Sequence, residues 1–535
     1  MEFLHILALV ATAICTYLLY LRFTTDATLP LPPGPKPLPL LGNIADFPPA
    51  GVSESEHWIK HKNAYGGISS VTVMGMTLVI IHDKKMAHDL LEQHASQTSG
   101  RPRMVMANKL CGYESIVLCQ GYNPTFKRCR KLLHRELGTM KSAAQFLGVQ
   151  DMEVKRQLVR ALNEPDRWLD HFKTTAGATV LKMAYDYVVE PHKPDPLVTL
   201  IDKMMTEFSL AASPMAWAVD IFPILQHLPE GFPGAGFKKT ARKWRRSIEA
   251  TAYIPYHFVL RHMDAHTNNP SYVSKLVQQC KLETGGEELG QEDSEAIAWT
   301  AASLYGAAAD TTVITLTAFT LAMLQNPEVQ QRAQAEIDHV VGTDRLPTFA
   351  DRDNLPYITA LVKESTRWWP ISPMGFPHTV TEAFDYNGYH IPKDAMLLPA
   401  VKWFLHDPSV YADPEQFDPA RFLSPRNEPD PTVEAFGYGR RICPGRFFAD
   451  QSLFLNIVHS LACFSIRPLL DRAGEPVPVD AKPKPGILSY PTAFDFKIEV
   501  RSEKHKSLIL AAGEEVPLEP SDARHLESIE NFEAK

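Results

Sequence analysis

The sequence lacks the marks of several large protein classes. It has no excess of positive charge, because 54 Lys and Arg stand against 62 Asp and Glu and the formal net charge is -8. Bulk electrostatics therefore give no support to nucleic-acid binding, and we expect no nucleic-acid partner. Its seven cysteines form no C-x-x-C pair or disulfide-like framework, which favours a reducing compartment. We also find no G-x-G-x-x-G after a strand and no P-loop.

The overall composition is that of a globular protein. Apolar residues make up 45% of the 535 residues and charged residues 22%, which excludes a mainly disordered, collagenous or polytopic membrane protein. The length allows about three domains or one large enzyme domain.

The first residues predict a membrane anchor. From Phe3 to Leu21 there are nineteen residues without a formal charge, and as a helix they would reach roughly 28 Å, close to the thickness of a hydrocarbon core. A cleaved signal peptide is the alternative, but a positively charged n-region is missing. Glu2 before the span and Arg22 after it favour a cytosolic position for the remainder. We therefore expect a single transmembrane helix over residues 1–21.

Composition divides the rest of the chain into three parts. Residues 22–43 are rich in proline and predict a stiff, extended hinge. Residues 44–505 hold the periodic segments and predict the catalytic domain. Residues 506–535 are acidic near their end, with seven acids from Glu514 onward against two bases, and we expect a disordered tail there.

The periodic segments indicate a mainly α fold with small β-sheets. Apolar runs at 68–73 and 76–81 flank Gly75 and predict a hairpin, and helical spacing follows at 84–94. Helical patterns dominate from about 123 to 340, while short strand-like pieces return from 380 to 399 around Asn387-Gly388.

One cysteine lies in a glycine-bounded loop just before a helical run. The segment is Phe-Gly-Tyr-Gly-Arg-Arg-Ile-Cys-Pro-Gly, residues 436–445. Helix N-terminal amides and Arg441 are expected to lower the pKa of Cys443, and Gly439 and Gly445 would let the backbone approach a flat ligand. Taken alone, Cys443 could equally be a buried structural thiol.

The same segment resembles the F-x-x-G-x-R-x-C-x-G haem-ligand signature of the cytochrome P450 superfamily, with Phe436, Gly439, Arg441, Cys443 and Gly445 at the fixed places. The resemblance covers residues 30 to 500. It implies a helical haem-binding body with a smaller β-rich subdomain, and haem b with Cys443 as the axial thiolate ligand of the iron. It also implies that Phe436 packs against the ligand loop and that Arg441 meets a haem propionate.

A second segment, Ala-Ala-Ala-Asp-Thr-Thr at residues 307–312, resembles the oxygen-activation motif of that family. The hydroxyl of Thr311 would hold the oxygen being activated or its water, and Asp310 would relay protons. Ala308 stands where relatives have glycine. Asp310 is the one charge between 296 and 326, so a membrane span is an alternative, although seven hydroxyl residues favour a helix buried in protein.

Two further resemblances concern folding and the propionates. Glu364 and Arg367 fit the E-x-x-R motif, and Arg421 fits the segment that completes a buried triad, which implies a role in folding and haem retention. Arg130 matches the arginine that binds a propionate. Phe126 stands where relatives often have tryptophan, so His378 is expected to supply the missing hydrogen bond.

The resemblance also implies where the electrons come from. A family member that is anchored in the endoplasmic reticulum membrane takes electrons of NADPH from a separate flavoprotein, NADPH–cytochrome P450 reductase, and cytochrome b5 can assist. An exposed basic cluster from Lys127 to Arg135 is either a docking surface for that partner or an ordinary solvated helix face.

Several segments are similar to microsomal (class II) members of mushroom-forming fungi, that is basidiomycetes, many of which oxidise terpenoids or other secondary metabolites. We therefore expect a monooxygenase that acts on a lipophilic small molecule. The alternatives are peroxide rearrangement, dehydration or ligand binding without turnover on the same haem fold, for which the acid–alcohol pair is often missing. A membrane-tethered helical scaffold without enzymatic activity is a third, minor alternative. The apolar, proline-interrupted stretch from Phe222 to Gly234, which Lys238 and Lys239 follow, is suited to lying on a bilayer or to core packing.

Overall fold

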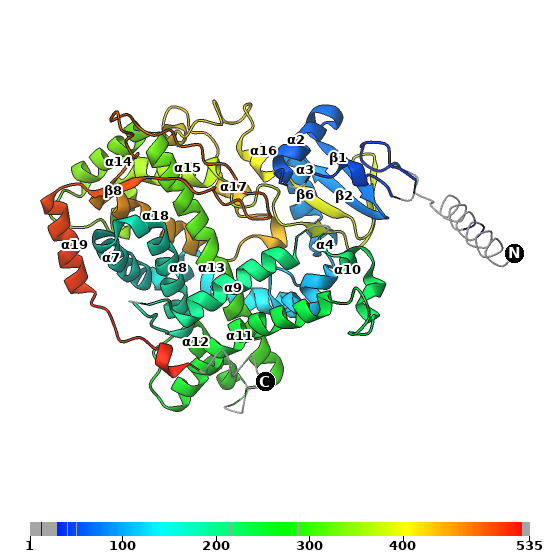
Figure 1. The fold of residues 1–535 in the computed structure, drawn as a ribbon, viewed down its shortest axis with the longest axis horizontal. Helices are drawn as coiled ribbons and strands as arrows, with labels where there is room; N and C mark the ends of the chain where they lie inside the picture. The colour runs from blue at the N-terminus through cyan, green and yellow to red at the C-terminus, as the bar shows by residue number, and fades with distance from the viewer. Residues whose placement is uncertain are drawn as a thin grey trace.

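The computed structural model describes residues 12, 16, 29–39, 41–49, 51–191, 193–213, 216–283, 285 and 289–526. Figure 1 shows a helical body beside a smaller region that carries the main sheet. This arrangement confirms the expected mainly α class with small β-sheets. The predicted membrane anchor, residues 1–21, lies outside the described residues except for Thr12 and Thr16.

The main sheet joins distant parts of the chain. Strands β1 (Ile68–Val73) and β2 (Met76–Ile81) form the predicted antiparallel hairpin, which turns at Met74 and Gly75 with positive φ. Strand β6 (Met396–Pro399) pairs with β2 in parallel, and β3 (His378–Thr379) pairs with β6 in antiparallel. The sheet order β1-β2-β6-β3 therefore places His378 at one edge of this sheet.

Two smaller sheets complete the strands of the described chain. Strands β4 (Phe384–Tyr386) and β5 (Tyr389–Ile391) form a hairpin whose central residues, Asn387 and Gly388, both have positive φ. Two positive φ angles in a two-residue loop match the twist of the flanking strands, which is why Asn-Gly predicts this turn. Strands β7 (Phe464–Arg467) and β8 (Lys497–Val500) pair near the C-terminal end.

The body contains long helices, shorter helices and one central helix that the others surround. The longer helices are α5 (Pro124–Leu137), α7 (Leu147–Asn163), α8 (Trp168–Tyr185), α9 (Pro196–Ala211), α11 (Phe237–Asp264), α12 (Tyr272–Glu283), α13 (Gln291–Gln325), α14 (Pro327–Val340), α15 (Pro356–Trp368) and α18 (Arg446–Cys463). The shorter or peripheral ones are α2 (Glu54–Tyr65), α3 (Lys84–His88), α4 (Ala95–Thr98), α6 (Met140–Ala143), α10 (Ala218–Ile221), α16 (Val401–Leu405), α17 (Thr432–Ala435) and α19 (Glu503–Glu515).

Helix α13 is the axis of the body rather than a membrane span. Within the described chain it is the one helix long and apolar enough to cross a membrane, but 67% of its most apolar window is buried inside the protein. Its hydroxyl residues are satisfied locally, since Thr300 and Thr320 each donate to the carbonyl four residues earlier. An apolar helix buried in this way packs neighbours on every side.

The proline-rich segment is more closely tied to the fold than a hinge would be. From residue 30 it runs along the sheet, where the backbone and hydroxyl of Ser70 donate to the carbonyls of Pro33 and Pro32 at 2.8 and 2.6 Å. His390 donates its backbone N–H to Pro30 at 2.8 Å. Proline has no N–H but keeps a carbonyl acceptor, so this segment docks by accepting hydrogen bonds. Part of the segment predicted as a hinge is therefore bonded to the strands.

The expectation of a disordered tail from residue 506 differs from the structure. Helix α19 begins after Ser502, whose side chain accepts a hydrogen bond from the backbone of His505. Buried Ile509 and Ala512 lie on one face of α19, and the helix packs on α7. A helix start and this short apolar face outweigh the acidic composition that suggested disorder.

Beyond α19, residues 517–526 form a strap across the outside of the body, drawn in red in Figure 1. Arg156 of α7 donates to the carbonyl of Pro517 at 2.7 Å and pairs with Glu519 at 3.0 Å. Asp522 and Val188 exchange two hydrogen bonds. These contacts hold the strap against helix α7 and the segment that follows α8, whereas residues 527–535 lie outside the description.

Candidate functional site

The cysteine loop lies between α17 and α18, at the end of a tight turn. The backbone N–H of Cys443 donates to the carbonyl of Phe436 at 2.8 Å, which closes the loop. Gly439 has φ +51, and a β-carbon there would collide with the carbonyl of Leu91. A β-carbon on Gly445 would meet nothing within 4 Å. Gly439 is therefore needed for packing within the chain, while the backbone at Gly445 is left free for a ligand to approach.

The pKa of Cys443 departs from the sequence-based expectation. Burial raises it above the ordinary thiol value, and this effect exceeds the lowering by the backbone N–H of Gly445 and by the charges of Arg130 and Arg446. Arg441 was expected to lower the pKa, but its guanidinium group points elsewhere. The correction has a physical reason, since desolvation of a thiolate opposes ionisation until a metal ion stabilises it.

Arg441 and two other arginines form a cationic cluster that hydrogen-bonds to backbone carbonyls. Arg441 is buried and donates to the carbonyls of Ser99 at 2.9 Å and Gln120 at 2.6 Å. Arg130 donates to the carbonyl of Ile442 at 2.8 Å. Arg101 donates to the carbonyls of Leu118, Phe376 and Pro377 at 2.9, 3.2 and 2.7 Å.

Within the described residues, none of these three arginines has a carboxylate partner. Burial, followed by the charges of Arg101 and Arg130, lowers the pKa of Arg441 to about 8. Burial and Arg130 likewise lower the pKa of Arg101 to about 10. Buried charges require compensation, so the cluster is matched to a ligand that carries negative charge.

The sequence did not single out Arg101. It lies between Gly100 and Pro102, in a loop without periodicity, and the local sequence carries no signal for its role. The fold brings it near Arg441 because Gly100 forms a backbone bridge to Thr379 of β3.

His378 and Phe126 surround the same cluster. His378 is buried, and its Nδ1 lies 2.9 Å from the carbonyl of Thr98, to which it donates. Burial and the charges of Arg101 and Arg441 hold the pKa of His378 well below its usual range. The neutral ring then offers an acceptor at Nε2. Arg101 is therefore better suited than His378 to donate the hydrogen bond that the sequence analysis expected for a propionate. Phe126 lies under the guanidinium of Arg441, 3.7 Å from ring centroid to Cζ.

Helix α13 is less buried at the predicted acid–alcohol pair than along most of its length. Ala307 is exposed and Asp310 and Thr311 are half-buried, although most of the surrounding helix is buried. The hydroxyl of Thr311 donates to the carbonyl of Ala307 at 2.8 Å. The carboxylate of Asp310 accepts a hydrogen bond from Tyr490. The two residues are adjacent on the helix, but each is bonded to a different partner.

The pKa of Asp310 is raised above its ordinary value. Burial is the main cause, and the hydrogen bond from Tyr490 acts against it. The charge of Asp202 adds to the increase and that of Lys173 opposes it. A carboxyl group whose pKa moves toward neutrality is better suited to give and regain protons.

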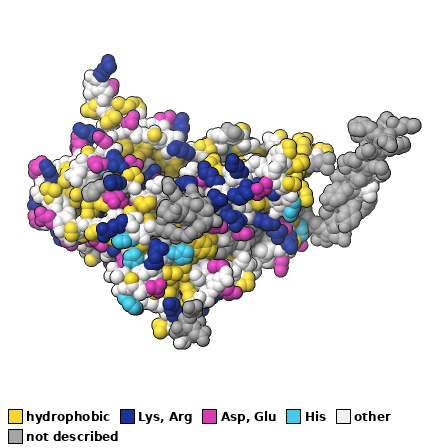
Figure 2. Space-filling model, turned by 60° about the horizontal axis from the view of Figure 1, so that its bottom comes forward, with side chains coloured by type: hydrophobic (Ala, Val, Ile, Leu, Met, Phe, Trp, Pro, Cys, Tyr) yellow, Lys and Arg dark blue, Asp and Glu magenta, His cyan; other side chains and the backbone are white. Residues whose placement is uncertain are grey.

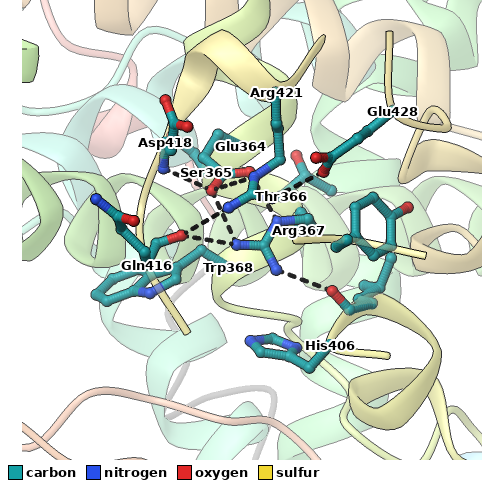
Figure 3. A network of polar contacts seen from close by, with 12 residues as sticks. Glu364, Ser365, Thr366, Arg367, Trp368, His406, Gln416, Asp418, Arg421 and Glu428 are labelled. Atoms are coloured by element: carbon teal, nitrogen blue, oxygen red, sulfur yellow. Dashed lines mark hydrogen bonds and ion pairs between the residues drawn. The ribbon is translucent and has the colours of Figure 1, made fainter. Parts of the chain in front are cut away.

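Glu364, Arg367 and Arg421 form a buried ionic network at the junction of α15 with the segment before the cysteine loop (Figure 3). All three side chains have an exposed fraction of 0%. Glu364 accepts from Nε and an Nη of Arg367 at 2.7 and 2.8 Å and from Nε of Arg421 at 3.0 Å. The structure thus brings together the three residues that the sequence assigned to a triad.

Backbone groups and a second acid complete this network. The N–H of Asp418 donates to Glu364 at 2.8 Å, and the carbonyl of Gln416 accepts from both arginines at 3.2 and 3.0 Å. Glu428 pairs with Arg421 at 2.7 Å. Two acids therefore balance two guanidinium groups, as buried charges require.

Comparison with known proteins gives matches over almost the whole chain. The family model described as Cytochrome P450 matches residues 32–498, which ends before α19. Cytochrome P450 monooxygenase CLM2 of Gibberella zeae is 45% identical over 522 residues, covering 97% of this chain and 99% of that protein. Cytochrome P450 monooxygenase claR of Ampulloclitocybe clavipes is 42% identical over 501 residues, covering 93% and 91%. O-methylsterigmatocystin oxidoreductase of Aspergillus flavus is 38% identical over 501 residues, covering 93% of each chain.

Proposed function

Because the chain belongs to the cytochrome P450 family, we propose that it oxidises or hydroxylates a lipophilic secondary metabolite such as a terpenoid, using O₂ and electrons from NADPH–cytochrome P450 reductase. The observation that carries this proposal is the acid–alcohol pair, Asp310 and Thr311, at the open middle of α13. A protein that merely binds a ligand, or rearranges a peroxide, has no need of a proton-delivering acid at this point.

The residues present fit a haem with a thiolate ligand. Cys443 would hold the iron through its sulfur, and the open space at Gly445 suits a flat macrocycle. The cluster of Arg101, Arg130 and Arg441 lacks a carboxylate partner among the described residues, and the two propionates would supply the missing negative charge. When bound, the haem supplies the redox centre at which oxygen is activated.

The chain's own side chains determine where protons go. Thr311 directs its O–H to the carbonyl of Ala307, which leaves its oxygen lone pairs available to accept a hydrogen bond from a nearby water. Asp310 can release a proton to such a water and regain one from solvent. The triad of Glu364, Arg367 and Arg421 acts on folding and haem retention, because it ties α15 to the segment that precedes the cysteine loop.

Electron delivery would use the basic surface beside the cysteine loop. Lys127, Lys131 and Arg135 are exposed on α5, and Arg440 is exposed on the loop itself. Arg128 is less suited to bind a partner's acids, because its guanidinium group already pairs with Glu292 at 3.0 Å and with Asp293. An acidic reductase surface, or that of cytochrome b5, is complementary to these four charges. Charge reversal at Lys127 and Lys131 should slow reduction most at low salt, whereas Lys393→Glu on the sheet side should not.

The chain would lie on the cytosolic face of the endoplasmic reticulum membrane, held by residues 1–21. Its contact with lipid would include the segment between α10 and α11, where Phe222, Ile224 and Phe232 are 51%, 73% and 53% exposed. Exposed lysines and arginines follow on α11, and Figure 2, which brings this side forward, shows Lys and Arg side chains beside hydrophobic ones. Apolar side chains next to bases suit the headgroup boundary of a bilayer. Deleting residues 1–21 should release the protein from membranes without loss of haem.

The test of the proposed reaction uses the holoprotein with reductase, NADPH and a panel of terpenoids. We expect an oxygenated product, and Thr311→Ala should keep its haem but divert reducing equivalents to peroxide or water. Product formation by Thr311→Ala with unchanged coupling would remove Thr311 from the mechanism. Absence of reductase-dependent oxidation of any lipophilic compound would refute the proposed function.

A further inference from the structure

A side chain outside the matched motifs reaches the acid of α13. Tyr490 belongs to the loop between β7 and β8, and its hydroxyl donates a hydrogen bond to Oδ2 of Asp310. The ring is partly buried against a cluster that includes Ile314 of α13 and Trp369. Tyr490 therefore contacts α13 through its ring and meets Asp310 through its hydroxyl.

The position of Tyr490 does not depend on its bond to Asp310. The backbone N–H of Ser489 donates to the carbonyl of Ile371 at 2.8 Å, and the indole N–H of Trp369 donates to the carbonyl of Ser489 at 2.6 Å. The hydroxyl of Ser372 donates to the carbonyl of Ile487 at 3.2 Å. The segment that follows α15 thus fixes the loop, and removal of the hydroxyl should leave the ring in place.

The direction of the hydrogen bond follows from the two groups. Burial and the nearby charge of Asp310 raise the pKa of Tyr490, so the phenol keeps its proton and donates it. Thr311 does not compete for the carboxylate, because its hydroxyl is bonded to Ala307. The other charged groups that act on Asp310 are Asp202 of α9 and Lys173 of α8, both exposed.

We propose that Tyr490 is a positioning residue for proton delivery: its hydroxyl holds the carboxyl group of Asp310 in one orientation beside Thr311 and so sets the share of reducing equivalents that end in product. This inference rests on the proposed monooxygenase function. The step involves protons alone. Asp310 breaks its carboxyl O–H bond to protonate a water beside Thr311, and regains a proton from solvent, while Tyr490 keeps its own.

The test compares two tyrosine variants of the haem-loaded protein. Tyr490→Phe removes the hydroxyl and keeps the ring, and we expect product per reducing equivalent to fall roughly tenfold, the effect of one lost hydrogen bond of about 1.4 kcal/mol, with peroxide rising in step. Haem content and the carbonyl spectrum should not change. Tyr386→Phe is the matched control, because it removes a tyrosine hydroxyl bonded to Asp89 at 3.1 Å, outside the site.

A second readout is independent of turnover. The infrared band of the Asp310 carboxyl group, identified by its loss in Asp310→Asn, reports the protonation of that group. Because the bond from Tyr490 lowers the pKa of Asp310, its removal should move the titration to higher pH, and Tyr386→Phe should leave it in place.

The outcomes separate this inference from the proposed function. Wild-type coupling and wild-type carboxyl titration in Tyr490→Phe, together with uncoupling in Thr311→Ala, would overturn the role of Tyr490 and leave the monooxygenase intact. If the wild-type protein oxidised nothing, the proposed function would fail. An infrared titration of Asp310 that is unchanged in Tyr490→Phe would separately overturn the control of Asp310 by Tyr490.

Discussion

Replacing Glu364 by glutamine removes the negative charge on which two buried arginines converge (Figure 3). The substitution preserves size, but an amide NH₂ would face one of the N–H groups of Arg367, and one guanidinium charge would be left without compensation. Breaking a buried pair in this way costs about 3 to 5 kcal/mol. A typical domain has about 5 to 15 kcal/mol of stability in total, so the loss is a large fraction.

The expected loss of unfolding free energy can be measured as a shift of the thermal unfolding midpoint. About 500 ordered residues give an unfolding entropy near 1 kcal/mol per degree, so Glu364→Gln should lower the unfolding midpoint by roughly 3 to 5 °C. The assay is thermal unfolding of the haem-loaded protein by circular dichroism, with haem content measured in parallel, and we expect haem content to fall as well.

The chain offers a matched control at the same spacing. Glu164 and Arg167 are also three residues apart and 2.9 Å from each other, but their side chains are 56% and 61% exposed. Exposed pairs contribute little to stability, so Glu164→Gln should leave the midpoint unchanged. Equal midpoints for Glu364→Gln and Glu164→Gln would show that burial does not give the triad its importance, and the reasoning would be wrong.

Two further predictions concern the strap and the buried histidines. Deleting residues 517–535 removes the bonds of Glu519 to α7 and α8 and those of Asp522 to Val188, and it should lower the unfolding midpoint without altering the carbonyl spectrum. Deleting 527–535 keeps those bonds, so equal midpoints for the two deletions would contradict the role of the strap. Burial lowers the pKa of His82 to about 4, below the unfolded value near 6.5, so the unfolded chain binds the extra proton and stability should fall as pH drops from about 6.5 toward 4. His82→Gln should flatten that dependence, and an unflattened profile would exclude His82 as a cause.

Local sequence patterns predicted the elements that local chemistry determines. The hairpin at 68–81 and the Asn387-Gly388 turn follow from alternation and from glycine at positive φ, and both are confirmed. The predicted family is confirmed as well, because the Cytochrome P450 family model matches residues 32–498. The prediction was possible because the loop around Cys443 matches a signature with five fixed places.

The parts that were wrong or missed depend on contacts between distant residues. The tail prediction failed because composition says nothing of α7, on which α19 packs. The pKa of Cys443 was assigned the wrong direction, since burial cannot be read from a loop sequence. Arg101 was given no role, and Tyr490 was expected only in a segment lining the pocket and not as a partner of Asp310, because Arg441 and Asp310 lie 340 and 180 residues away from them.

The central claim is that the sulfur of Cys443 binds the haem iron, and the reduced, carbon-monoxide-treated absorption spectrum tests it most directly. We expect the band of a thiolate-ligated haem in the wild-type protein and in Cys463→Ala, a change at a buried cysteine at the far end of α18, and its loss in Cys443→Ala. A Cys443→Ala protein that kept the wild-type carbonyl band would contradict the account.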